Sequence, residues 1–157
     1  SGGAARSAIQ GLINLKMSKI VVISRNKTSL DSLINDFKNQ KSIKSVYFKN
    51  ENIPNYINSA DLIVNTTPVG MINNTSAKEE LPFGKNFWIS LNSKTIIYDL
   101  IYNPQETSLL KFARKKGCQT INGMKMLVVQ GAKSLSYWTD DLTIPIDIME
   151  EAIKKYL

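Results

Sequence analysis

The first residues of the chain have the composition of a phosphate-binding turn. Residues 1–6 are Ser-Gly-Gly-Ala-Ala-Arg, and they run directly into a segment with helical spacing. Glycines let the backbone approach a pyrophosphate, and a helix start offers N–H groups and the positive end of the helix dipole. With one more glycine before Ser1, the run would be the tail of a G-x-G-x-x-A turn. The pattern predicts a nucleotide site at Gly2, Gly3, Ala4 and Ala5, and a plain tight turn is the alternative.

A second polar group follows the next apolar run, where NAD-binding proteins place an acidic residue for the ribose 2′-OH, about twenty residues after the glycines. This chain has Ser24, Arg25 and Asn26 there, followed by Lys27. A guanidinium can bind a 2′-phosphate through charge-assisted, bidentate hydrogen bonds. The group therefore favours NADP over NAD, with a strand-end arginine in water as the alternative.

The composition excludes several other kinds of chemistry. The 157 residues include no histidine and one cysteine, which excludes Ser-His-Asp triads, imidazole zinc sites and a disulfide framework. We predict no metal site. Lys and Arg outnumber Asp and Glu by 20 to 13, and the excess lies in residues 1–50, which suits a phosphate-bearing ligand or a solvated basic face.

The sequence also limits where the protein acts and what it binds. No apolar run approaches the ~20 residues that cross a bilayer, and no signal peptide opens the chain. We therefore expect a cytoplasmic protein without a membrane partner. The basic first third lacks a nucleic-acid recognition motif and interleaved aromatic residues, so we expect no nucleic-acid partner.

Strands and helices are expected to alternate along the chain. Apolar runs typical of buried strands lie at 19–24, 45–48, 62–65, 95–100 and 119–121, and helical patterns lie at 4–16, from a Thr28 cap through 37, at 107–116, 124–138 and 147–156. Residues 72–94 are expected to be irregular with one short helix. This order predicts an α/β fold: a Rossmann-like, doubly wound, mostly parallel sheet with helices on both faces. Because no strand precedes the glycine turn, we expect the chain to be part of a longer polypeptide that supplies the first, most central strand.

Five segments, in order, resemble the NADP-binding domain of shikimate dehydrogenase. They are Ser1–Arg6, Ser24–Asn26, Asn65–Met71 (Asn-Thr-Thr-Pro-Val-Gly-Met), Tyr98–Pro104 (Tyr-Asp-Leu-Ile-Tyr-Asn-Pro) and the most distinctive one, Asn122–Ala132 (Asn-Gly-Met-Lys-Met-Leu-Val-Val-Gln-Gly-Ala). The resemblance implies NADPH-dependent reduction of 3-dehydroshikimate to shikimate in the chorismate pathway of aromatic amino acid biosynthesis. It also implies an active site between two domains, with the catalytic Lys and Asp in an amino-terminal domain that this sequence lacks. No catalytic residue is therefore assigned to this chain, which is expected to be inactive by itself.

The resemblance assigns roles to individual positions. It implies that the pyrophosphate lies on the opening glycine turn, the 2′-phosphate on Ser24, Arg25 and Asn26, the cofactor ribose beside Thr66, Thr67 and Pro68, the nicotinamide beside Leu100, Gly123 and Met126, and the substrate beside Tyr102 and Gln130. The contact of Gly123 with the carboxamide is expected through its backbone. Two positions depart from the family: Ser29 replaces a second basic residue found in some members, and Lys125 replaces a glycine.

The resemblance also implies a domain organisation and leaves rival functions open. Residues 1–145 would form the NADP-binding domain, and residues 146–157 a helix that returns toward the missing substrate domain; a homodimer stays open. The rivals are a quinate/shikimate dehydrogenase that uses NAD, another Rossmann reductase such as glutamyl-tRNA reductase, and a non-catalytic nucleotide- or nucleic-acid-binding module.

Overall fold

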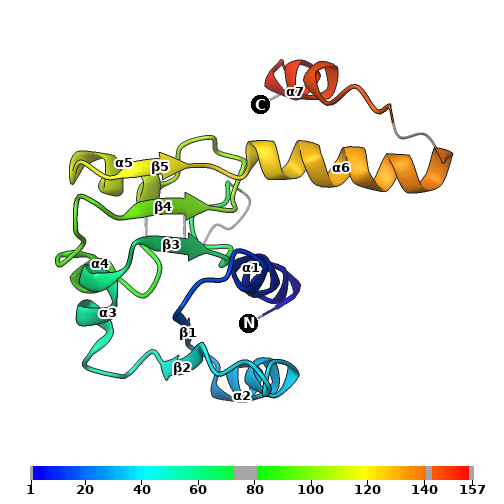
Figure 1. Ribbon diagram of the computed structural model, residues 1–157. Coiled ribbons are helices and arrows are strands. Elements are labelled where there is room, and N and C mark those ends of the chain that lie inside the picture. Colours follow the sequence, from blue (N-terminus) through cyan, green and yellow to red (C-terminus); the bar gives the residue numbers. More distant parts are fainter. Residues whose placement is uncertain (1, 73–80, 141–142, 156–157) are drawn as a thin grey trace.

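The computed structural model describes residues 2–72, 81–140 and 143–155, and helices alternate with strands along it (Figure 1). The elements are α1 (Gly3–Asn14), β1 (Ile20–Ser24), α2 (Lys27–Asp36), β2 (Ile43–Tyr47), α3 (Ile53–Ser59), β3 (Leu62–Asn65), α4 (Lys85–Trp88), β4 (Ile96–Asp99), α5 (Ser108–Lys115), β5 (Gln119–Ile121), α6 (Met124–Thr139) and α7 (Ile146–Lys154). Each predicted strand is present, within two residues of its expected ends.

Every strand pair in the described residues is parallel. β1 pairs with β2, while β3, β4 and β5 form a second sheet in that order. In the second sheet Asn65 is the register partner of Asp99, so the last residues of β3 and β4 lie side by side. Parallel strands joined through helices confirm the predicted Rossmann-like α/β class.

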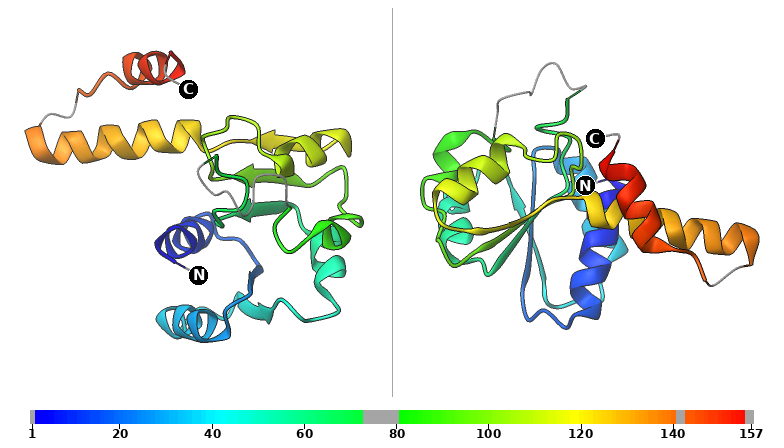
Figure 2. Two further views of the ribbon diagram at one scale, coloured as in Figure 1. Left: turned by 180° about the vertical axis from the view of Figure 1, so that it is seen from behind. Right: turned by 90° about the horizontal axis from the view of Figure 1, so that it is seen from above.

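Helices cover both faces of the strands (Figure 2). Along β1, Val21 and Ile23 pack against the larger apolar cluster, which α3, α4 and α5 share, whereas Ile20 and Val22 belong to a second cluster under α1 and α2. Successive side chains of a strand point to opposite faces, so the all-apolar run of β1 serves two cores. The larger cluster contains residues of β2 and β4 and therefore joins the two sheets.

Among the described residues only β4 is paired on both sides; of the four strands with a single partner, β1 and β3 face each other across the two sheets. β1 is paired with β2 and β3 with β4, and Figures 1 and 2 place β1 and β3 on the facing sides of the two sheets. Both strands are apolar runs, yet Val21–Ile23 and Leu62–Val64 are only partly buried. Such runs are typical of strands with neighbours on both sides.

Three local features differ from the expectation or refine it. The cap of α2 is Asn26, whose side chain accepts a hydrogen bond from the Ser29 N–H at 2.9 Å; the prediction of Thr28 was wrong because the helix already begins at Lys27. α3 was not predicted from the sequence. The sequence predicts that Gly117 ends the helix expected at 107–116; Gly117 has φ +85° directly after Lys116, the C-cap of α5, and this confirms the prediction.

The last two helices extend away from the strands (Figure 1). α6 begins beside the second sheet, and α7 packs along α6. Large apolar side chains on this pair are exposed, with Trp138 at 82% and Ile148 at 65%. Apolar residues recur along α7 from Ile146 to Ile153. No helix in the described ranges is both long and apolar enough to span a membrane.

Candidate functional site

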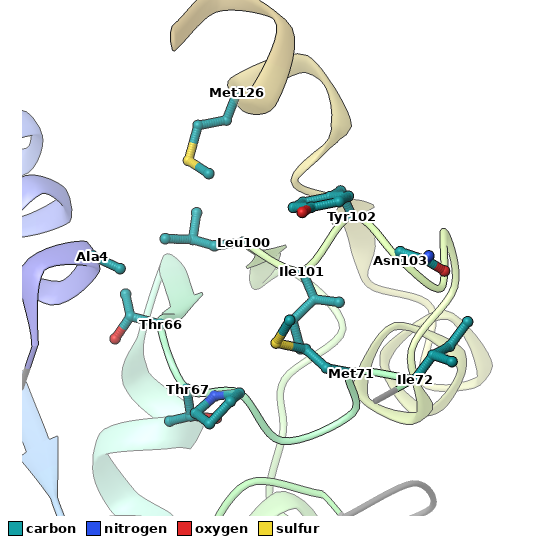
Figure 3. Close-up of a pocket in the computed structure, with 11 residues that line it drawn as sticks. Ala4, Thr66, Thr67, Met71, Ile72, Leu100, Ile101, Tyr102, Asn103 and Met126 are labelled. Carbon is teal, nitrogen blue, oxygen red and sulfur yellow. The ribbon is translucent and has the colours of Figure 1, made fainter. Parts of the chain in front are cut away.

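A pocket of about 370 Å³ lies at the carboxyl ends of β3 and β4 (Figure 3). Four segments meet there: the first turn of α1, the loops that follow β3 and β4, and the first turn of α6. The lining residues are Ala4, Thr66, Thr67, Pro68, Met71, Ile72, Leu100, Ile101, Tyr102, Asn103 and Met126. Ligands of open α/β sheets bind at this end of the strands, because the loops diverge there.

The start of α1 leaves its backbone open beside the pocket. The helix begins at Gly3, and Gly2 provides no side-chain cap. A Cβ added at Gly2 or Gly3 would meet no atom within 4 Å, so packing among the described residues does not require these glycines. They leave the first N–H groups of the helix accessible from solvent, next to Ala4 in the pocket lining, as the binding of an anionic group requires.

Three buried polar side chains, Asn65, Asp99 and Thr107, form hydrogen bonds with one another beneath the pocket loops. The Asp99 carboxylate, 0% exposed, accepts hydrogen bonds from Asn65 Nδ2 at 2.9 Å, from the Ile101 N–H at 3.2 Å and from Thr107 Oγ1 at 2.7 Å. Burial raises the pKa of Asp99 above its ordinary value, and the three hydrogen bonds act in the opposite direction. Asp99 therefore holds the groups that donate to it in place, and it does not itself line the pocket.

Gly123 is needed where the first turn of α6 crosses the loop after β4. A Cβ at this position would lie 1.9 Å from the carbonyl oxygen of Leu100. The Gly123 N–H donates to the Ile101 carbonyl at 3.0 Å. This close approach brings Met126 to the pocket, where its side chain faces Leu100 (Figure 3). Both backbone groups of Gly123 are used inside the protein, since its carbonyl accepts from the Leu127 N–H.

The residues after β1 form an exposed turn outside the pocket lining. Ser24 Oγ accepts from the Asn26 N–H and donates to the Asn26 carbonyl, both at 3.2 Å, and Asn26 caps α2. Arg25 is exposed at this turn. Lys27 pairs with Asp31 at 2.8 Å, and this hydrogen bond raises the pKa of Lys27. Both side chains of this pair are exposed.

The structure brings together about half of the predicted site residues. Seven line the pocket: Ala4, Thr66, Thr67, Pro68, Leu100, Tyr102 and Met126. The others, which are Gly2, Gly3, Ala5, Ser24, Arg25, Asn26, Gly123 and Gln130, do not. Ala5 packs in the core under α1, and Gln130 is exposed one turn beyond Met126 on α6. Neither residue is therefore placed for direct contact with the pocket in this structure.

Four lining residues were not predicted as site residues. Met71, Ile101 and Asn103 stand inside the segments that carried the resemblance, so their neighbours were the available signal; Ile72 lies just after such a segment. Within the described residues, no group of three or more Cys, Asp and Glu side chains could hold a metal ion.

Comparisons with known proteins relate the chain to shikimate dehydrogenases. No protein-family model matches the chain. The protein named shikimate dehydrogenase (NADP(+)) of Prochlorococcus marinus subsp. pastoris is 60% identical over 157 residues, which are 100% of this chain and 55% of that protein. The chain thus spans about half the length of the curated relatives that it matches.

Solved structures of quinate and shikimate dehydrogenases superpose on this chain. Quinate dehydrogenase from Corynebacterium glutamicum in complex with NAD superposes with a TM-score of 0.82 at 25% identity, covering 98% of this chain and 52% of that one. A shikimate dehydrogenase in complex with NADP+ superposes with a TM-score of 0.70 at 27% identity, covering 98% and 60%. Along its full length the chain is therefore similar to about half of proteins named shikimate dehydrogenase, as its motifs predicted.

Proposed function

We propose that this chain is the cofactor-binding half of a shikimate dehydrogenase that reduces 3-dehydroshikimate to shikimate with NADPH. The observation that carries the proposal is the pocket at the carboxyl ends of β3 and β4, which opens beside the uncapped glycine start of α1. The 60% identity to a protein named shikimate dehydrogenase (NADP(+)) supports the choice of reaction.

The residues present fit a dinucleotide. The exposed N–H groups at the start of α1 would hold the pyrophosphate, and Arg25 at the neighbouring turn would bind the 2′-phosphate. Thr66, Thr67 and Pro68 would line the ribose, while Leu100 and Met126 offer apolar contact for the nicotinamide and exclude water. When bound, the cofactor would supply the hydride.

The substrate end depends on fewer groups of this chain. Tyr102 would contact the substrate from the pocket lining, and Gln130 would do so from the exposed side of α6. The catalytic Lys and Asp would come from the remainder of a longer polypeptide.

We also propose how that remainder joins this chain. One strand between β1 and β3 would give six strands in the doubly wound order 3-2-1-4-5-6, with the present β2 and β5 at the edges. The partly buried apolar residues of β1 and β3 support this insertion. Residues 1–145 would then form the cofactor domain, and the helix within 146–157 would return to the substrate domain, supported by the exposed apolar side chains of α7.

Arg25 decides between NADP and the rival preference for NAD. Lys27, which pairs with Asp31 at the same exposed turn, is a second cation near this position, and Ser29 supplies none. Loss of one charge-assisted hydrogen bond corresponds to roughly 10- to 100-fold in affinity. We expect Arg25→Ala in the intact enzyme to weaken NADP+ by about that factor and NAD+ by less than about twofold.

The test is a titration of the intact enzyme with NADP+ and NAD+ by calorimetry. Arg114→Ala is the matched control, because it removes the same charge from α5, where Arg114 pairs with Glu106. Equal losses for both cofactors, or equal effects of the two variants, would refute the 2′-phosphate contact. Failure of the intact enzyme to bind either cofactor, or to oxidise shikimate, would refute the proposed function. The 157-residue chain by itself should bind weakly and show no turnover.

Cytoplasmic location, the absence of membrane and nucleic-acid partners, and a homodimer stay predictions. A salt-dependent association with DNA or RNA that exceeded the affinity for NADP+ would favour the nucleic-acid-binding alternative. Sedimentation of the intact enzyme would decide the homodimer.

A further inference from the structure

The buried carboxylate below the pocket is a charged group that the proposed function does not use. Asp99 is fully buried and contacts no cation among the interactions of the described residues; its two oxygens accept three hydrogen bonds. Burial of an ionised carboxylate costs free energy unless hydrogen bonds compensate it. A buried carboxylate without a neighbouring cation therefore calls for an explanation in terms of what its hydrogen bonds hold in place.

Two chains of hydrogen bonds, here called arms, end at Asp99. In the first, the Val69 N–H donates to Thr67 Oγ1 at 3.3 Å, and Thr67 Oγ1 donates to Asn65 Oδ1 at 2.8 Å. The Thr67 N–H also donates to Asn65 Oδ1, at 3.0 Å, and the other end of the same amide, Nδ2, donates to Asp99. Every donor in this arm points toward the carboxylate, so each bond polarises the next.

The second arm comes from α5. The Leu110 N–H at the start of the helix donates to Thr107 Oγ1 at 3.3 Å, and Thr107 Oγ1 donates to Asp99 Oδ2 at 2.7 Å. Thr107 is thus the N-cap of α5 and a donor to Asp99 at once. The positive end of the α5 dipole also lies on this side of the carboxylate.

The two arms and the Ile101 N–H connect the pocket loops to one point. The first arm holds the backbone at Thr67 and Val69 in the loop after β3, and the Ile101 N–H belongs to the loop after β4. Thr67 and Ile101 both line the pocket. Apolar side chains could fill this space, but they would not fix the position of either loop, because apolar contacts are non-directional.

We propose that Asp99 is a positioning residue of the cofactor pocket, which sets the two pocket loops through Asn65, Thr107 and the Ile101 N–H. The proposal rests on the proposed function, because it concerns the same pocket. Asp99 does not touch the cofactor; it acts through the residues that do.

Thr107 provides the sharpest test, because the chain contains a matched control. Thr95 is also fully buried, and its Oγ1 donates to the Ala60 carbonyl at 2.8 Å. It stands just before β4, whereas Asp99 is the last residue of that strand. Thr107→Val and Thr95→Val each remove one buried hydroxyl. Thr107→Val removes the donor to Asp99 and the N-cap acceptor of α5, whereas Thr95→Val removes only the hydrogen bond to the Ala60 carbonyl.

The experiment measures NADP+ binding and thermal unfolding of the intact enzyme and its variants. We expect both variants to lower Tm, and only Thr107→Val to weaken NADP+, by about tenfold, the size of one charge-assisted hydrogen bond; Thr95→Val should change the Kd by less than about twofold. Thr107→Ser keeps the hydroxyl and should restore the affinity to within about twofold.

Two results overturn the inference. One is an equal change of the Kd in Thr107→Val and Thr95→Val; the other is an unchanged Kd in Thr107→Val. If Thr107→Val does not fold, Asp99→Asn replaces it, since it keeps the shape but turns one acceptor into a donor, and an unchanged Kd there overturns the inference as well. Absence of NADP+ binding by the wild type would instead refute the proposed function, and a wild type that binds separates the two failures.

Discussion

The polar residues at the ends of β3 and β4 and those at the end of β1 are placed in opposite ways. Asn65 and Asp99 are buried, and their hydrogen bonds lie inside the protein. Arg25 and Lys27 are exposed to water. The first arrangement orders loops around a largely apolar pocket, and the second presents charge to the solvent.

The difference indicates which property each end of a dinucleotide demands. A nicotinamide has to be oriented within fractions of an ångström, so its pocket needs loops that are fixed before binding. A 2′-phosphate is recognised by charge, so a side chain that samples several rotamers can bind it. We therefore expect changes at the β3–β4 end to affect folding and orientation together, and changes at the β1 end to affect affinity with little effect on stability.

The largest effect at the β3–β4 end is expected for Gly123→Ala. The added Cβ would lie 1.9 Å from the Leu100 carbonyl oxygen, a backbone atom that cannot move without displacing the pocket loop. We expect the free energy of unfolding of the intact enzyme to fall by more than about 3 kcal/mol, measured by urea denaturation.

Gly11→Ala is the control for the glycine substitution. Gly11 lies within α1, and a Cβ there meets no atom within 4 Å. Alanine should stabilise the helix by about 0.5–1 kcal/mol. A loss below about 1 kcal/mol in Gly123→Ala would show that the crossing of α6 over the loop is not as close as described.

A second effect concerns the pH dependence of stability. Burial raises the pKa of Asp99 above its ordinary value of 3.8, so the folded state binds this proton more tightly than the unfolded state. As the pH falls through the raised pKa toward 3.8, the wild type should therefore gain stability relative to Asp99→Asn. At neutral pH the buried carboxylate costs stability.

Urea denaturation of both proteins between neutral pH and pH about 4 checks this prediction, because the difference between them isolates Asp99 from the other carboxyl groups. A constant difference would show that the hydrogen bonds balance the effect of burial on the Asp99 pKa, and a change in the opposite direction would show that they outweigh it.

Much of the fold followed from patterns that depend on neighbouring residues only. Short β-branched runs such as Ile20–Ile23 gave the strands, and Gly117 marked the end of α5. α3 was missed because its seven residues include Pro54 and polar positions, and its burial comes from contact with strands distant in sequence. The cap of α2 was placed at Thr28 because Ser24–Asn26 was interpreted only as a ligand site, whereas Asn26 also caps the helix.

Some residues of the candidate site could be predicted from the sequence, and others could not. Thr66 and Leu100 were found because family motifs mark the loops that they belong to. The sequence suggested that Asp99 contacts the substrate or caps a turn near the cleft; its hydrogen bonds to Asn65 and Thr107 could not be predicted, since they depend on the register of β3 against β4 and on the cap of α5. The same holds for the contact of Gly123 with Leu100, which joins residues far apart in sequence.

The smallest effect is expected between α1 and α2, on the exposed side of the comparison. Arg6 Nε donates to Asp36 Oδ2 at 2.7 Å, and both side chains are more than a third exposed. Exposed ion pairs of this kind contribute roughly 0.2–1 kcal/mol and are screened by salt. A double-mutant cycle with Arg6→Gln and Asp36→Asn should give a coupling energy in this range at low salt.

The cycle is preferable to either single variant, because each charge also lies at an unfavourable helix end: Arg6 in the first turn of α1 and Asp36 at the last residue of α2. In about 1 M salt the coupling should fall close to zero, while the stability lost in Thr107→Val should persist, since water and ions do not reach Asp99. A coupling that persisted in salt would show that the Arg6–Asp36 pair is shielded from water, as the buried network is. The contrast between exposed and buried polar groups would then not hold for this pair.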